Sequence, residues 1–149
     1  MPLLRMLLLW IAFPVLAQQP APPDPELAAR LGADRFGMRS YVLVILRSGP
    51  SPVPEGEARR AMFAGHFANM ERLAREGRLV VAGPFGSNPD GWRGLFILAT
   101  DDLDQARAWT ETDPVIVHGE MVAEYRPWYG SAALMEVGRI HREIAAESP

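Results

Sequence analysis

The order of the apolar segments between residues 40 and 128 constrains the fold of this chain more than any other feature. Residues 40–46 (SYVLVIL) form a continuous β-branched run, which is typical of a strand with both faces covered. A helical pattern follows at residues 57–76, with Gly77 in the position of a left-handed helix cap. Three further strands are predicted at residues 78–82, 95–99 and 120–128, a second helix at residues 101–112 and a last helix at residues 132–145.

This order of strands and helices predicts an α+β fold of the ferredoxin-like type. The βαββαβ unit forms an antiparallel sheet with two helices on one face, followed here by a C-terminal helix. Residues 41–46 and 95–99 are apolar on both faces, although helices cover only one face of such a sheet. We therefore expect the open face to pack against a second subunit, which would give a homodimer and a dimeric α+β barrel. The alternative cover is the C-terminal helix or the N-terminal arm folding back.

Local signals set the boundaries of the second helix and the faces of the last strand. Thr100 or Asp101 is expected to cap the helix, and Asp113 to end it, because the residue before a proline avoids the helical region. The strand at residues 120–128 alternates in polarity. Its apolar side is formed by Met121, Ala123 and Tyr125, and its wetter side by Glu120, Val122 and Glu124.

The N-terminal segment has the form of a secretory signal peptide. Residues 1–17 combine a short positive start, an apolar stretch of about eleven residues and small residues before the cleavage point. We expect secretion into the periplasm and no membrane span after cleavage, since a span needs about twenty apolar residues. An uncleaved membrane anchor is the alternative. The rest divides into a Pro-rich tether with a short helix capped by Asp24-Pro25 (18–38), a main domain (39–130) and a helical tail (131–149).

Composition restricts the available chemistry to histidine, carboxylate and arginine. The chain has no cysteine and all 15 basic residues are arginine, which excludes thiolate, Schiff-base and lysine-dependent phosphate chemistry. The net charge of −3 gives no electrostatic reason to expect a nucleic-acid partner. His66, His118 and His141 do not have the spacing of metal ligands. We therefore expect neither a metal nor another cofactor.

His66 is the one strongly polar side chain on the apolar stripe of the helix at residues 57–76. A helical wheel at about 100° per residue places it among apolar neighbours. These are Met62, Phe63, Phe67, Met70, Leu73 and Ala74. An unpaired buried polar group costs about 1–3 kcal/mol, so the imidazole needs a partner. That partner is either a backbone carbonyl, in a purely structural arrangement, or an acidic side chain.

Asp113 is the candidate acidic partner. The helix dipole disfavours an acidic residue at a helix C-terminus by about 0.3–1 kcal/mol, so Asp113 needs compensation there. The two helices lie side by side in this fold, and the loops at their ends can converge. A carboxylate bonded to His66 would fix its tautomer and stabilise its imidazolium form, as general acid/base catalysis requires. The alternative is that Asp113 is a turn residue, since Asp-Pro commonly starts turns.

Five separated stretches, in order along the chain, carry a family resemblance. They are residues 65–70 (GHFANM), 73–84 (LAREGRLVVAGP), 94–97 (GLFI), 112–115 (TDPV) and 124–128 (EYRPW). Together they resemble the YCII-related (YciI-like) family over residues 41–128. The resemblance implies a dimeric ferredoxin-like α+β barrel, akin to that of muconolactone isomerases, and an active-site histidine and aspartate at His66 and Asp113. Most members have no assigned substrate, and one group acts as a dehydrochlorinase of a hydroxylated ring, a cytoplasmic step not expected of a secreted protein.

Two functions are consistent with these residues. In the first, the protein is an enzyme of the isomerase, lyase or dehydrohalogenase type on an unknown small molecule, with His66 as general acid/base and Asp113 as its orienting partner. In the second, it is a non-catalytic dimeric domain, for ligand binding or structure, and the pair is a structural hydrogen bond. The candidates for substrate contact are Arg93, Tyr125 and Trp128. Arg93 beside a turn is equally consistent with a solvated side chain, and Trp128 with edge packing.

Overall fold

Four antiparallel strands form one sheet in the order β2-β3-β1-β4. They are β1 Met38–Ser48, β2 Leu79–Pro84, β3 Trp92–Leu98 and β4 Met121–Ser131. The computed structural model describes residues 22–147, so the expected signal peptide at residues 1–17 and the first residues of the tether lie outside it. With helices following β1 and β3, this is the ferredoxin-like α+β topology that the sequence pattern predicts.

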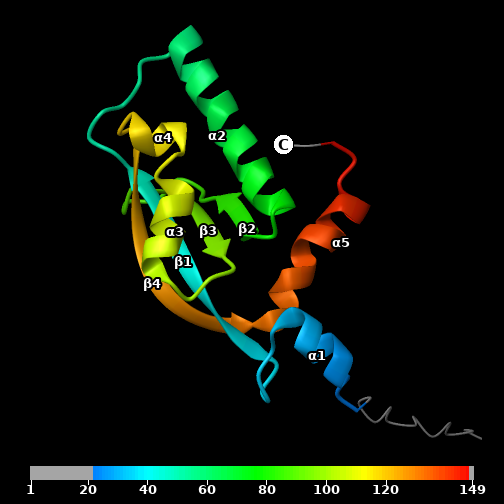
Figure 1. Cartoon of the computed structure of the whole chain (residues 1–149). Helices are drawn as coiled ribbons and strands as arrows, with labels where there is room; N and C mark the ends of the chain where they lie inside the picture. Colours follow the sequence, from blue (N-terminus) through cyan, green and yellow to red (C-terminus); the bar gives the residue numbers. More distant parts are fainter. Residues whose placement is uncertain (1–21, 148–149) are drawn as a thin grey trace, which may run out of the picture.

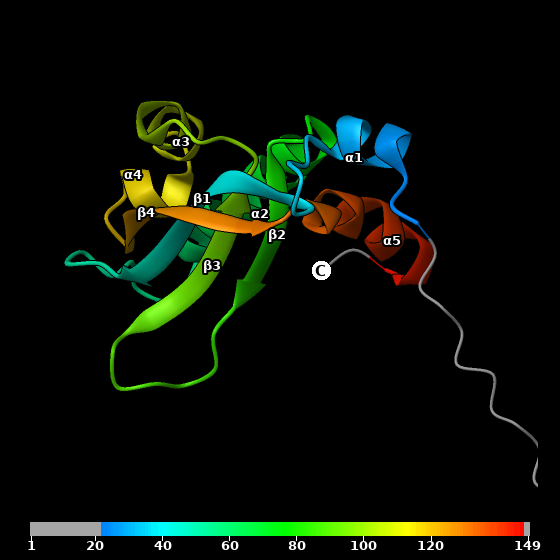
Figure 2. The same cartoon turned by 90° about the horizontal axis from the view of Figure 1, so that it is seen from below.

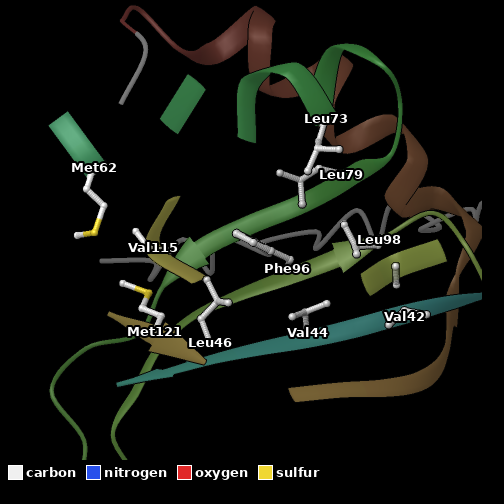
Figure 3. Packing of buried hydrophobic residues seen from close by; sticks show 11 residues of the cluster. Val42, Val44, Leu46, Met62, Leu73, Leu79, Phe96, Leu98, Val115 and Met121 are labelled. Carbon is white, nitrogen blue, oxygen red and sulfur yellow. The ribbon is translucent and has the colours of Figure 1, made fainter. Parts of the chain in front are cut away.

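Two helices, α2 (Glu57–Arg75) and α3 (Leu103–Thr110), cover one face of the sheet (Figure 1). Figure 3 shows apolar side chains of α2 and of the strands meeting in the main core. On α2 the buried residues are Met62, His66 and Leu73, so His66 is buried on the apolar stripe as the helical wheel predicts. Phe67, expected on the same stripe, is instead 47% exposed. Within residues 22–147, no helix has the length and apolar character needed to cross a membrane.

The segment after β3 differs from the prediction of one helix ended by Asp113. α3 stops at Thr110, and its N-cap is Asp102, where Thr100 or Asp101 was expected. A short helix, α4 (Pro114–Val117), follows, with Asp113 as its N-cap and Pro114 at its first position. The carboxylate of Asp113 therefore lies at the favourable, positive end of a helix. The expectation that the helix dipole disfavours the Asp113 carboxylate is wrong, because Asp113 precedes α4 as its N-cap and does not end α3.

The C-terminal tail covers part of the other face of the sheet. It consists of a 3-10 segment, η1 (Ala132–Glu136), and α5 (Val137–Ile144), in place of the single predicted helix at residues 132–145. From η1, Leu134 and Met135 pack in a second core cluster whose buried members are Tyr41, Val80 and Ile97. The short helix α1 (Pro25–Leu31), capped by Asp24 as predicted, lies beside the tail at the same end of the sheet (Figure 2). Over this part of the face, the alternative cover by the tail is confirmed.

The rest of this second face carries apolar side chains that the tail does not bury. Ile45 and Leu95 are only partly buried, and Val122 is 42% exposed. Leu43, also partly buried, lies at the border, where it packs against the cluster of Tyr41, Val80 and Ile97. Strand pairing places Leu43 opposite Ile97, and Ile45 opposite Leu95, on the face away from α2. This apolar area extends over β3, β1 and the start of β4, beyond the part that the tail covers.

Candidate functional site

The structure brings His66 of α2 into direct contact with Asp113, the N-cap of α4. The imidazole Nδ1 lies 2.9 Å from Oδ2 and 3.0 Å from Oδ1 of the carboxylate. Asp113 is fully buried and His66 is 7% exposed. Asp113 is therefore the acidic partner of His66, and its carboxylate lies at the positive end of α4, where the helix dipole favours it.

Two further donors fix the carboxylate of Asp113. The backbone N–H of Val115 donates to Oδ1 at 3.1 Å, and the side-chain amide of Asn69 donates to Oδ2 at 3.1 Å. Asn69 is itself held by Arg72, which donates to its side-chain oxygen at 2.7 Å. With these bonds and the one to His66, the orientation of Asp113 is fully determined.

The Asp113 contact also fixes the tautomer of His66. An ionised carboxylate only accepts hydrogen bonds, so the proton of the neutral imidazole resides on Nδ1. No protein group among the described residues hydrogen-bonds to Nε2. Every fully buried side-chain nitrogen or oxygen among those residues has a partner, so Nε2 is not fully buried. Nε2 is therefore accessible from the adjoining pocket, with a lone pair free to accept a proton.

This pocket beside His66 has a volume of about 300 Å³. Besides His66 and Arg93, its walls are apolar side chains and the backbone at the ends of β2 and β3. The apolar side chains belong to Leu46, Phe63, Phe67, Met70, Pro84, Phe85, Phe96 and Met121. The His66 ring stacks on Phe96 at a centroid distance of 6.1 Å and contacts Phe67 at 5.5 Å. A pocket with apolar walls and few polar groups is the usual form of a small-molecule site.

A β-bulge directs Arg93 into the same pocket. Leu46 of β1 pairs with Gly94 of β3, but the next residue, Arg47, pairs with Trp92, so Arg93 is an extra residue in β3. Strict alternation from Phe96 would place Arg93 on the opposite face of the sheet. Because of the bulge, its side chain instead lies on the helical side, where Nη1 is 3.6 Å from Glu120.

Glu120 is a buried carboxylate that the sequence analysis placed on the wetter side of the last strand. It is 3% exposed. Its oxygens accept hydrogen bonds from the backbone N–H of Val53 at 2.7 Å and pair with Arg59 at 2.8 Å. Burial by itself raises the pKa of Glu120, but the bonds from Val53 and Arg59 and the charge of Arg93 outweigh it and lower the pKa below its usual value. A single acidic residue before a strand carries no local signal for this burial.

The structure does not place Tyr125 and Trp128, the other candidates for substrate contact, in the pocket. Tyr125 packs under α3, where its hydroxyl hydrogen-bonds to that of Thr110 at 2.6 Å and burial raises its pKa. Trp128 lies on the second face of the sheet against Tyr41, with ring centroids 5.7 Å apart. Their distance from His66 follows from strand pairing, which puts Tyr125 opposite Val44 and Trp128 opposite Tyr41.

The other two histidines lie away from the pocket. His118 caps the C-terminus of α4 and His141 lies on α5, and both are exposed. Across residues 22–147, no three His, Asp or Glu side chains are grouped closely enough to hold a metal ion. The functional candidates in the described chain are therefore the His66–Asp113 pair and Arg93.

The YCII-related domain family matches residues 40–129, which include β2, β3, most of β1 and β4, and both residues of the His66–Asp113 pair. This protein belongs to the YCII-related family. Among its relatives, the uncharacterized protein YjpA of Bacillus subtilis is 31% identical over 65 residues, covering 44% of this chain and 73% of YjpA. Protein YciI of Escherichia coli O6:H1 is 34% identical over 70 residues, covering 42% of this chain and 71% of YciI.

One solved structure in the comparison is 5-chloro-2-hydroxyhydroquinone dehydrochlorinase (TftG) from Burkholderia phenoliruptrix, in complex with 2,5-dihydroxybenzoquinone. It is 22% identical to this chain, with a TM-score of 0.42, and the match covers 58% of this chain and 92% of TftG.

Proposed function

We propose that this protein is a small-molecule enzyme in which His66 acts as general acid/base and Asp113 orients it. One observation carries the proposal: His66 is anchored through Nδ1 to a buried carboxylate, while Nε2 is left free toward an apolar pocket. This leaves Nε2 available to exchange a proton with a molecule bound in the pocket. The arrangement is that of a histidine base with a carboxylate partner.

The chemistry is proton transfer at carbon, as in an isomerase, lyase or dehydrohalogenase. Nε2 of neutral His66 takes a proton from an acidic C–H bond, and the electron pair of that bond moves into the substrate. The resulting imidazolium is stabilised by the Asp113 carboxylate, whose own position is fixed by Asn69 and Val115. The proton then returns from Nε2 to another atom of the substrate. In an elimination, a leaving group instead departs with its bonding electrons, and Nε2 releases the proton to that group or to water.

The test is deuterium incorporation in D₂O. A panel of small metabolites with acidic C–H bonds is incubated with the protein, and loss of C–H signals is followed by proton NMR. The proposal predicts exchange in at least one compound, with the rate reduced about 10²–10⁴-fold in His66→Ala. His141→Ala, which removes an exposed histidine on α5, is the matched control and should keep the wild-type rate. Exchange that is equal in His66→Ala and wild type, with both proteins folded, would contradict the assignment.

A second candidate function is a non-catalytic domain in which the pair is structural. The observation that favours it is the role of Asp113 as N-cap of α4, since this bond to Val115 stabilises the fold whatever His66 does. This alternative predicts that His66→Ala lowers the melting temperature of the protein. It also predicts that no compound of the panel incorporates deuterium or raises the melting temperature.

We propose that a second copy of the chain covers the open part of the second sheet face. The support is the apolar area formed by Leu43, Ile45, Leu95 and Val122, next to the part that the tail already covers. Light scattering should give the mass of a dimer, and Val122→Asp should shift it toward the monomer. The control is Val117→Asp, which changes a 65% exposed valine of α4 on the other side of the sheet. A strictly monomeric wild type would contradict the dimer.

We also propose that residues 1–17 direct export and are removed, so that the mature protein begins at Gln18 and works in the periplasm. The support is the charge and small-residue pattern of this segment. Mass spectrometry of the protein recovered from its native host should show the mature N-terminus. Recovery of the full chain from the cytoplasm would contradict export.

A further inference from the structure

We infer that the pocket beside His66 selects small monocarboxylates with an apolar body, and that Arg93 is the group that binds the carboxylate. The inference rests on the proposed function, because it names the substrate class of the same site. It begins from the β-bulge in β3, which turns Arg93 away from the second sheet face, where alternation would direct it, and into the pocket. Bulges that re-aim a side chain in this way are common next to active sites.

The guanidinium of Arg93 has donors available for a ligand. Its nearest acidic partner, Glu120, lies 3.6 Å from Nη1, beyond hydrogen-bonding distance. Within residues 22–147, no side-chain or backbone oxygen accepts a hydrogen bond from it. Arg59 is different, since it donates to the carbonyl of Val53 at 2.8 Å and pairs with Glu120 at 2.8 Å and with Glu55 at 3.1 Å. Arg59 thus makes the direct hydrogen bond to Glu120, and Arg93 keeps a planar set of N–H groups that matches a carboxylate.

The charges around the pocket favour one negative charge on the ligand. Arg93 is the one residue of permanent charge that lines it, and no aspartate or glutamate is among its described lining residues. Two carboxylates lie just behind the walls, Glu120 beside Arg93 and Asp113 behind His66. A second negative charge on the ligand would have no free cation to pair with and would be repelled by these groups.

The walls of the pocket favour a planar carbon body. Four phenylalanines line it: Phe63, Phe67, Phe85 and Phe96. Their rings favour contact with another flat, apolar group, and offer nothing to the hydroxyls of a sugar. The volume of about 300 Å³ is at the lower end of the range for ligand pockets, so a ring-sized molecule fits better than a larger one.

The test compares benzoate with benzamide, which has the same shape and no charge. Each probe is titrated into the ¹⁵N-labelled protein at constant ionic strength, and the amide signals of Gly94 and Phe96 are followed by NMR. Benzoate is expected to bind about tenfold or more tightly than benzamide. Arg93→Gln should abolish the difference, and Arg93→Lys should retain part of it. Arg126→Gln, which changes an exposed arginine of β4 on the second face, is the matched control and should leave the preference intact.

Several outcomes would overturn the inference. These are equal binding of benzoate and benzamide, a benzoate preference that survives in Arg93→Gln, displacement of benzoate by an equal concentration of inorganic phosphate, or no binding of any probe. His66→Ala separates this inference from the proposed function. Arg93-dependent binding of benzoate should persist in that variant even though proton exchange is lost. No proton exchange by the wild-type protein, together with intact benzoate selectivity, would therefore refute the chemistry and leave the carboxylate site standing.

Discussion

Gly65 of α2 lies directly against Pro114, the first residue of α4. A Cβ atom on Gly65 would be 2.8 Å from Cγ of Pro114, closer than non-bonded carbon atoms pack. The next residue after Gly65 is His66, and the residue before Pro114 is Asp113. The absence of a side chain at Gly65 therefore lets α2 and α4 approach closely enough for the imidazole to reach the carboxylate.

Gly65→Ala is expected to lower the free energy of unfolding by about 1 kcal/mol, measured by urea denaturation. Overpacking costs about 1–3 kcal/mol, and the better helix propensity of alanine offsets only about 0.5–1 kcal/mol of this. Gly138→Ala on α5 is the matched control, because its Cβ would meet nothing closer than Arg142 at 3.8 Å. That variant should gain stability by about 0.5 kcal/mol. A stability gain in both variants would show that α2 and α4 are not tightly apposed.

The tautomer of His66 is a second prediction. When the ring is neutral, the proton should reside on Nδ1, since this nitrogen faces Asp113 at 2.9 Å. Long-range ¹H–¹⁵N NMR spectra, recorded as the pH is raised until the ring is neutral, distinguish the two tautomers. Exposed His141 provides the signal of a second histidine for comparison in the same sample. A proton on Nε2 would contradict the assignment of that atom as the base.

Glu120 should contribute to stability in a pH-dependent way. Its pKa is lowered in the folded protein, so its contribution is fully present above the unfolded-state value of about 4.3. The contribution is lost as the pH falls through the lower folded-state pKa. Near neutral pH, Glu120→Gln should cost about 1.5–3 kcal/mol, because it weakens charged hydrogen bonds from Val53 and Arg59.

The measurement for Glu120 is the free energy of unfolding at pH 7 and at pH 3. The difference in the free energy of unfolding between wild type and Glu120→Gln should be smaller at pH 3 than at pH 7. Glu71→Gln, which changes an exposed carboxylate on α2, should stay within about 0.5 kcal/mol of wild type at pH 7. A gap that is constant with pH would mean that the charge of Glu120 is not what stabilises the fold.

The tail should stabilise the sheet through η1. Leu134→Ala removes a half-buried side chain that packs in the cluster of Tyr41, Val80 and Ile97, and should cost about 1–2 kcal/mol. Ile144→Ala, at a position that is 75% exposed on α5, should change stability by less than about 0.5 kcal/mol. Thermal and urea unfolding measure both. Equal effects of the two substitutions would mean that the packing of Leu134 against this cluster does not stabilise the fold.

Periodicity in the sequence predicted the succession of strands and helices along the chain, the span of α2 and the burial of His66. These features are local, because the side-chain directions of a helix or strand follow from its own repeat. The Asp113-Pro114 pair was harder to interpret. It was expected to end the preceding helix, but that helix stops at Thr110 and the pair begins the next one. Only the fold shows that this position places the carboxylate beside His66.

Other features of the site depend on contacts between distant segments, and no local pattern contains them. Arg93 enters the pocket because of a bulge between β1 and β3, where alternation alone would direct it to the other face. Glu120 is buried because Val53 and Arg59 satisfy its oxygens. Tyr125 and Trp128 were candidates by residue type, but strand register places them under α3 and on the second face.

Chemical rescue of His66→Ala tests the central claim most directly. The measured quantity is the rate of deuterium incorporation into the exchanging compound, with and without added imidazole. If Nε2 of His66 is the base, the variant loses about 10²–10⁴-fold in rate, and imidazole entering the vacated space beside Asp113 restores part of it. A folded His66→Ala variant that exchanges at the wild-type rate without imidazole would contradict the account.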